Sequence, residues 1–161
     1  MPSPNPARIA MLLDYQNVLQ RGHWLYGRGK EPYQCVPEPA LVADLLARRR
    51  RVPSEATSIL VFRGRPNPKH EPRPARANDA QSQQWERRDG RIEVRSRQLF
   101  YRNWPHDPPV EKGIDVALAI EAVRLAGAES GPAGSGRIRP HSPGGVVVLH
   151  GRPQFHGGAG R

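Results

Sequence analysis

The sequence predicts an α/β protein in which helices flank a parallel β-sheet, followed by an irregular C-terminal tail. Three observations support this class. Residues 8–13 form an apolar segment that suits a strand covered on both faces. Helix-like and strand-like segments alternate after it, as in parallel sheets with right-handed crossovers. The last 35 residues hold ten of the sixteen glycines, and residues 127–145 show no helical or strand period.

The predicted elements before the tail are strands at 8–13, 57–62 and 92–101 and helices at 38–51, 75–88 and 111–126. After Arg8 the first strand is apolar, from Ile9 to Leu13, and it is expected in the middle of the sheet. In the third strand, Ile92 and Val94 alternate with charged residues, which predicts a half-exposed strand near an edge. Proline-rich loops at 66–74 and 102–110 separate the later elements.

Apolar periodicity supports the first and last of these helices. The helix at 38–51 has prolines near its start and arginines in its last turn. Its predicted apolar stripe consists of Leu41, Val42, Leu45 and Leu46. The helix at 111–126 is the clearest in the chain, and its apolar positions include Ile114, Leu118, Val123 and Leu125. Within the tail, only residues 146–149 have the pattern of a strand.

Composition limits the classes of function. The 161 residues are enough for one domain with a core, and 25 Lys and Arg against 15 Asp and Glu give a net charge of +10. This charge favours a polyanionic partner, with nucleic acid ahead of an anionic membrane surface. The single cysteine, Cys35, excludes an intramolecular disulfide, and no apolar run suggests a signal peptide or a membrane span. We therefore expect a soluble, cytoplasmic protein.

Carboxylates stand at two positions that parallel sheets use for ligands. Asp14 comes directly after the first strand, and Asp115 lies near the start of the helix at 111–126. Because ligands bind beyond the carboxyl ends of parallel strands, both side chains are expected at one crevice. Two convergent carboxylates repel each other unless a cation joins them, and oxygen ligands select a hard ion such as Mg²⁺ or Mn²⁺. The pattern predicts metal-assisted cleavage of a phosphodiester.

Each of these residues also has a structural interpretation. Asp115 can be an N-cap or first-turn residue of its helix, and Asn17 can be a turn or cap residue. The arginines at 48–51 can be a solvated helix end that the helix dipole favours. Three aromatic residues can stack on bases, although ordinary packing explains them more simply: Trp85, Trp104 and Phe100.

A resemblance supports the catalytic interpretation. The stretch AMLLDYQNV is similar to the opening of the NYN domain, a ribonuclease family of the PIN-like superfamily that begins with a strand ending in Asp-x-x-Asn. The stretch EKGIDVALAIEAVRLA resembles the second signature of that family, Lys-Gly-hydrophobic-Asp before a long helix. Between them, VFRGRPNP, ANDAQSQQW and RSRQLFYRNWP follow the order expected of bacterial members. The resemblance covers about residues 8–126.

The resemblance implies a PIN-like, Rossmann-like sheet and Mg²⁺- or Mn²⁺-dependent cleavage of RNA. By this match Asp14 and Asp115 would bind the metal ion, and Asn17 would orient the site or its water, so that these three are the candidate catalytic residues. Basic side chains would contact the RNA, and the candidates are Arg48, Arg49, Arg50, Arg63, Arg65 and Lys112.

The sequence departs from the family pattern near its end. Family members carry a later strand followed by a motif like Ser-Gly-Asp-Ser-Asp-Phe, whose first Asp completes the metal site. Here Arg152 and Gln154 stand where the acids are expected. Two nearby glutamates are candidates to substitute, and Glu111 is the better one, because Glu121 points about 240° round the helix from the aspartate.

The expected organisation is therefore an incomplete NYN domain at 1–126 and a Gly/Pro/Arg-rich tail at 127–161 with a short strand at 146–149. A frameshift or natural divergence could have produced this tail. The expected function is a metal-dependent endoribonuclease, impaired in this chain by the missing acid. Two alternatives remain open, a catalytically inactive RNA-binding domain and an adaptor that binds a protein partner along the edge near residues 92–101.

Overall fold

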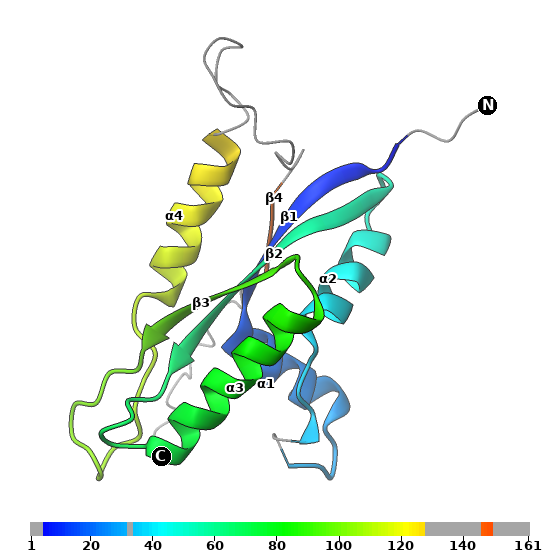
Figure 1. The fold of residues 1–161 in the computed structure, drawn as a ribbon. Coiled ribbons are helices and arrows are strands. Elements are labelled where there is room, and N and C mark those ends of the chain that lie inside the picture. Colours follow the sequence, from blue (N-terminus) through cyan, green and yellow to red (C-terminus); the bar gives the residue numbers. More distant parts are fainter. Residues whose placement is uncertain (1–4, 32–33, 128–145, 150–161) are drawn as a thin grey trace, which may run out of the picture.

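The protein contains a parallel β-sheet with the strand order β3-β2-β1-β4 (Figure 1). The strands of this computed structural model are β1 (Ala7–Asp14), β2 (Ser54–Arg65), β3 (Ile92–Gln98) and β4 (Val146–Leu149). The structure describes residues 5–31, 34–127 and 146–149. The predicted α/β class, a parallel sheet flanked by helices, is confirmed, and β1 lies inside the sheet as expected, between β2 and β4.

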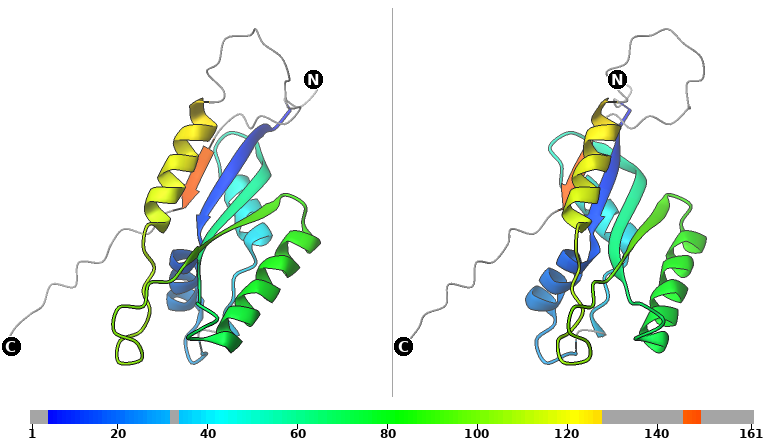
Figure 2. Two further views of the ribbon diagram at one scale, coloured as in Figure 1. Left: turned by 60° about the vertical axis from the view of Figure 1, so that its left-hand side comes forward. Right: turned by 90° about the vertical axis from the view of Figure 1, so that its left-hand side faces the viewer.

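Among the described residues, four helices cover the two faces of the sheet, and Figure 2 shows α4 on one side and the other helices opposite. The helices are α1 (Tyr15–Tyr26), α2 (Pro39–Arg48), α3 (Pro72–Arg88) and α4 (Ile114–Gly127). None of the helices in the described part of the chain is long and apolar enough to cross a membrane.

The strand β1 supplies side chains to two separate cores. Ile9, Met11 and Leu13 face α1, α2 and α3, while Ala10 and Leu12 face α4. All five are completely buried, because successive residues of a strand point to opposite faces and both faces of this sheet are covered. The continuous apolar run at 8–13 therefore has the physical cause that the sequence predicts.

The first two helices differ from the sequence prediction. The helix α1 was not predicted at all. In α2 the predicted stripe is partly wrong, because Leu41 and Leu45 are 69% and 53% exposed while Ala43 and Ala47 are buried. Alanines allow the helix backbone to approach the sheet closely, so the buried face of α2 carries its small residues.

The later elements agree better with the prediction. The strand β3 is an edge strand, as the alternation of Ile92 and Val94 predicts, but it ends at Gln98. In α4 the predicted core position Val123 is wrong, since its side chain is 74% exposed, and the helix packs on the sheet through Ile114 and Leu118.

The strand β4 occupies the residues that have a strand pattern in the tail. It pairs in parallel with β1, and Leu149 is in register with Leu13, so that the carboxyl ends of both strands lie at one edge of the sheet. The predictions made for Arg152 and Gln154, and the irregular pattern at 128–145, fall on residues outside the described ranges.

Candidate active site

A cavity of about 400 Å³ opens at the carboxyl edge of the sheet. Its wall combines the first two turns of α1, the end of β2, Asn78 of α3, and the loop at 99–113 that leads into α4. Ligand pockets commonly measure about 300–1,000 Å³, so the space suits a group of nucleotide size.

Asp14 and Asn17 form one hydrogen-bonded unit beside this cavity. Asp14 ends β1 and is the N-cap of α1, where its Oδ1 accepts a hydrogen bond of 3.2 Å from the backbone N–H of Asn17. The Nδ2 of Asn17 donates to Asp14 Oδ2 at 2.6 Å. The Asp-x-x-Asn spacing therefore closes the first helical turn and fixes the carboxylate at the strand end.

Glu111 brings a second carboxylate to Asp14. It lies in the loop before α4, and its Oε1 accepts a hydrogen bond of 2.6 Å from the backbone N–H of Gly64 at the end of β2. Burial raises the pKa of the Glu111 carboxyl above its ordinary value. The Asp14 carboxylate also raises this pKa, while the hydrogen bond from Gly64 and the charge of Arg63 lower it. A Cβ at Gly64 would lie 2.6 Å from Glu111 Oε1, so glycine is required for this approach.

Asp115 lies at the start of α4, as predicted. It lies in the first turn of α4, and its side chain is exposed. Neither Asp115 nor Asp14 belongs to the residues that line the cavity, whereas Glu111 does. The position of Asp115 agrees with the helix-start interpretation, since a carboxylate there is stabilised by the helix dipole. Its role as a metal ligand stays a prediction.

Arg63 places a cation in the wall of the cavity. Its guanidinium lies 5.2 Å from the ring centroid of Tyr15 and 5.0 Å from that of Trp85, and its Nη1 donates to Ser82 Oγ at 3.3 Å. Burial lowers the pKa of this guanidinium, which nevertheless remains charged at neutral pH. A half-buried arginine held by two aromatic rings is suited to binding an anionic group.

Two buried polar atoms in this wall have no hydrogen-bond partner among the described residues, Arg63 Nε and Asn78 Oδ1. The other end of the Asn78 amide donates to the Gly64 carbonyl oxygen at 3.0 Å. An unpaired donor and an unpaired acceptor are costly to bury, and such atoms concentrate at functional sites or beside water.

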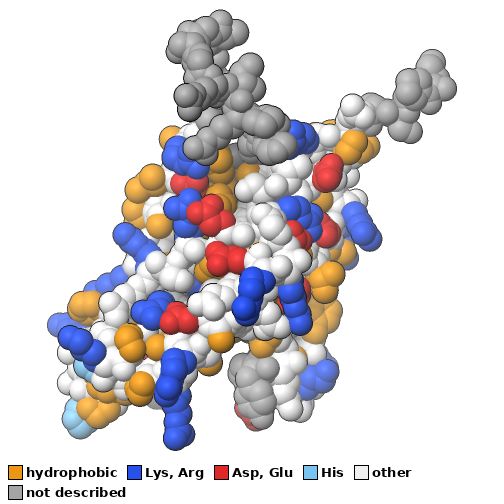
Figure 3. Space-filling model, viewed as in Figure 1, with side chains coloured by type: hydrophobic (Ala, Val, Ile, Leu, Met, Phe, Trp, Pro, Cys, Tyr) orange, Lys and Arg blue, Asp and Glu red, His pale blue; other side chains and the backbone are white. Residues whose placement is uncertain are grey.

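The remaining candidate RNA-binding residues are divided between the two ends of the sheet. Arg65 forms a bidentate pair with Asp79, and Lys112 lies 3.9 Å from the ring centroid of Phe100, both at the carboxyl end. Arg50 donates to Ser54, the first residue of β2, which places the run Arg48–Arg50 at the opposite end. The length of β1 separates the two regions by roughly 20 Å. On the face drawn in Figure 3, basic side chains are spread widely and interspersed with acids.

The donor set at this edge fits a divalent cation held by two carboxylates. Asp14 and Glu111 supply hard oxygen ligands, and Mg²⁺ is commonly bound by one or two carboxylates together with substrate phosphates and water. No group of three His, Cys, Asp or Glu side chains in the described ranges is arranged to hold a metal ion.

Comparison of the chain with protein-family models, with curated proteins and with solved structures finds no match.

Sequence reasoning missed the polar wall that α3 contributes. Asn78, Ser82 and Trp85 stand at intervals of four and three residues, and all three are buried on the face of α3 that meets the sheet. That spacing places them on one side of a helix, so the segment ANDAQSQQW carried the signal. The spacing alone could not show that Ser82 and Trp85 contact Arg63.

Proposed function

We propose that this protein is a metal-dependent endoribonuclease of the NYN type, which cleaves phosphodiester bonds of RNA at the carboxyl edge of its sheet. The observation that carries the proposal is that Asp14 ends β1 while Glu111 is hydrogen-bonded to Gly64 at the end of the neighbouring strand β2, beside the cavity that Arg63 lines. A divalent cation can join two neighbouring carboxylates, and an arginine nearby favours a phosphate.

Each residue has a definite task in this proposal. Bound Mg²⁺ or Mn²⁺ would lower the pKa of an attacking water and stabilise charge on the phosphate. Asp14 and Glu111 would hold the ion, Asn17 keeps the Asp14 carboxylate in one orientation, and Gly64 does the same for Glu111. Arg63 would stabilise the negative charge that develops on the phosphoryl oxygens. The net charge of +10 supports binding to the RNA backbone through counterion release.

Titration of Mn²⁺ into the protein tests the metal site directly. We expect Asp14→Asn and Glu111→Gln each to weaken Mn²⁺ binding by more than the roughly 10- to 100-fold typical for loss of a supporting outer partner. Asp107→Asn is the matched control, because its exposed carboxylate is bonded to Asn103 in a loop. Equal Mn²⁺ affinity in all four proteins would refute the site.

Asp115→Asn separates the two possible ligand sets. The resemblance predicts that this variant loses the metal, whereas the geometry favours Glu111 as the partner of Asp14. A cleavage assay on single-stranded RNA with Mn²⁺ then tests turnover, which Asp14→Asn should abolish while RNA binding survives.

An RNA-binding domain without turnover is the second candidate function. It is favoured by the finding that the described side chains bring two acids together and not three. Salt-dependent RNA binding without Mn²⁺-dependent cleavage would establish this candidate in place of the nuclease.

A further inference from the structure

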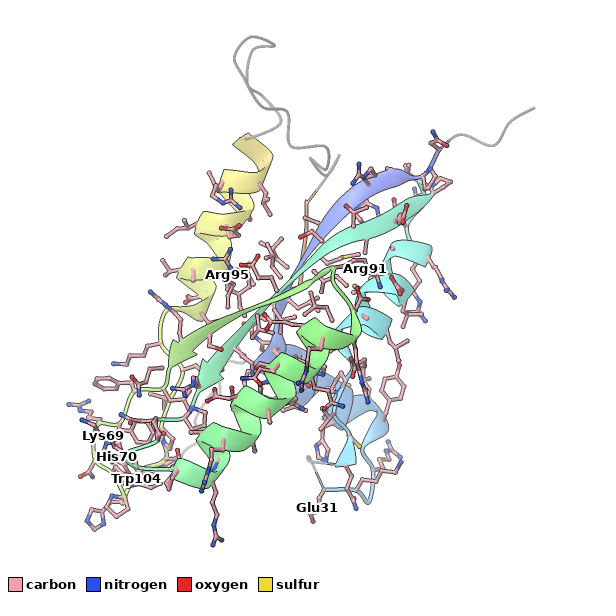
Figure 4. The ribbon with its side chains drawn as sticks, viewed as in Figure 1. Glu31, Lys69, His70, Arg91, Arg95 and Trp104 are labelled. Carbon is pink, nitrogen blue, oxygen red and sulfur yellow. The ribbon has the colours of Figure 1, made fainter. Side chains whose placement is uncertain are left out.

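Three aromatic side chains gather on the loops beyond the carboxyl ends of β2 and β3. The His70 and Tyr101 rings are stacked with their centroids 4.6 Å apart, and Trp104 stands edge-on to Tyr101 at 5.5 Å. Figure 4 shows His70 and Trp104 close together, next to Lys69, at the end of the molecule away from β4. We refer to His70, Tyr101 and Trp104 as the aromatic cluster.

The aromatic cluster is fixed at its centre and open at its surface. The hydroxyl of Tyr101 donates to the Glu71 carboxylate and accepts a hydrogen bond of 3.0 Å from the backbone N–H of Asn67. These bonds hold the Tyr101 ring in place. His70 is exposed and Trp104 is 37% exposed, so both can offer ring surface to a ligand. A preformed surface loses little conformational entropy when a partner stacks on it.

Exposed cations lie on the same loops as the aromatic cluster, together with the acids Glu71 and Asp107. Lys69, Arg73 and Arg102 are exposed on the same two loops and the first turn of α3. Lys112 lies on the ring of Phe100, which is itself 42% exposed. In Figure 3 basic, histidine and hydrophobic side chains lie together at the lower left, over these loops. Aromatic rings among cations are the combination that single-stranded nucleic acids require, because bases stack while phosphates pair with the cations.

The same loops connect the aromatic cluster to the cavity. Pro66 follows β2 and lines the cavity, and the chain then reaches His70 within four residues. Leu99 and Val110 line the cavity from the two ends of the segment that carries Tyr101 and Trp104. The aromatic cluster and part of the cavity wall therefore belong to the same two loops.

We propose that the aromatic cluster is a stacking platform for the bases of single-stranded RNA that enters the cavity. This inference rests on the proposed function for the identity of the polymer and adds how its bases are held. The stacking is sequence-tolerant, since every base has a π-face. RNA uses both features at once, because its bases stack on the rings while its phosphates pair with the exposed cations.

Binding of a fluorescently labelled single-stranded RNA of about ten nucleotides tests the platform. The full chain is used at constant salt with a chelator present, so that cleavage cannot occur. We expect Trp104→Ala to weaken binding about 5- to 150-fold, the range for loss of one stacked base. Trp104→Phe should keep part of the affinity because it keeps a ring. Trp24→Ala is the matched control, since Trp24 is 73% exposed on α1, and it should bind like the parent protein.

Binding of inorganic polyphosphate distinguishes base stacking from charge attraction. It has phosphates without bases, so the parent protein and Trp104→Ala should bind it equally. Two results would overturn the platform. One is unchanged RNA affinity in Trp104→Ala, which would favour a protein partner for this surface. The other is an equal loss of affinity for RNA and for polyphosphate. Reduced RNA binding in Trp104→Ala together with no Mn²⁺-dependent cleavage by the parent protein would keep the platform and refute the nuclease.

Discussion

Replacement of Asp14 by alanine or by asparagine should separate its structural task from its chemical one. Alanine removes the N-cap acceptor of α1, which typically costs about 1 kcal/mol, with a range of about 0.5–2. It also removes the acceptor of the 2.6 Å bond from Asn17 Nδ2, and hydrogen bonds to charged groups contribute about 1.5–3 kcal/mol. Relief of the repulsion on Glu111 acts in the opposite direction. The expected net loss is about 2–3 kcal/mol.

Asparagine caps helices about as well as aspartate, so Asp14→Asn should cost about 1 kcal/mol or less. For a folded unit of this size, 1 kcal/mol corresponds to roughly 3–5 °C in Tm. The alanine variant should therefore unfold about 6–15 °C below the parent protein and the asparagine variant about 5 °C below it at most.

Denaturant and thermal unfolding in the presence of a chelator measure both losses without a metal contribution. The m-value should stay constant, because the surface exposed on unfolding is the same. Equal stability losses in the two variants would refute the capping role, since only alanine lacks an acceptor for the N–H of Asn17. Retained Mn²⁺ binding by Asp14→Asn would refute the chemical role.

Three further outcomes are expected. In the absence of metal, the free energy of unfolding of the parent protein should fall relative to that of Glu111→Gln as the pH rises from the ordinary glutamate pKa through the raised pKa of Glu111. Unfolding measured at several pH values should show the two free energies converging at acidic pH. Tyr15→Phe should cost about 1 kcal/mol in urea unfolding, because the Pro37 carbonyl loses its 3.0 Å bond, and a loss under about 0.3 kcal/mol contradicts this. RNA affinity should fall steeply with salt, and Lys112→Gln should lower the log–log slope by about 0.7; a slope equal to that of the parent would remove Lys112 from the interface.

The sequence predicted the elements that bury a continuous apolar pattern. The β1 run from Ile9 to Leu13 is covered on both sides, and its composition alone required this. The helix α1 could not be predicted in the same way, because only Tyr15 is buried while Trp24 and Tyr26 face solvent. Besides Tyr15, Leu19 packs against the core, so α1 buries little apolar surface and has no continuous apolar run like that of β1.

The positions of single site residues could be predicted from the sequence, but which of them lie together could not. Asp14 follows an apolar strand, so its place at the carboxyl edge follows from the topology. The choice between Glu111 and Asp115 as its neighbour depends on the path of the loop before α4, which the Gly64 hydrogen bond fixes. Likewise, the sequence shows that Arg48 and Arg63 are basic, but only the strand directions place them at opposite ends of the sheet.

The backbone N–H of Gly64 is hydrogen-bonded to Glu111 only while Glu111 is in place, so this N–H reports on the assembly of the site. Glu111 stands three residues before α4, which by itself covers one face of the sheet. Local opening of that helix would withdraw Glu111 and expose the Gly64 amide, while Asp14 keeps its place at the end of a strand shared with the larger core. Hydrogen exchange at Gly64 therefore reports how often the two carboxylates are separated in solution, with or without RNA present.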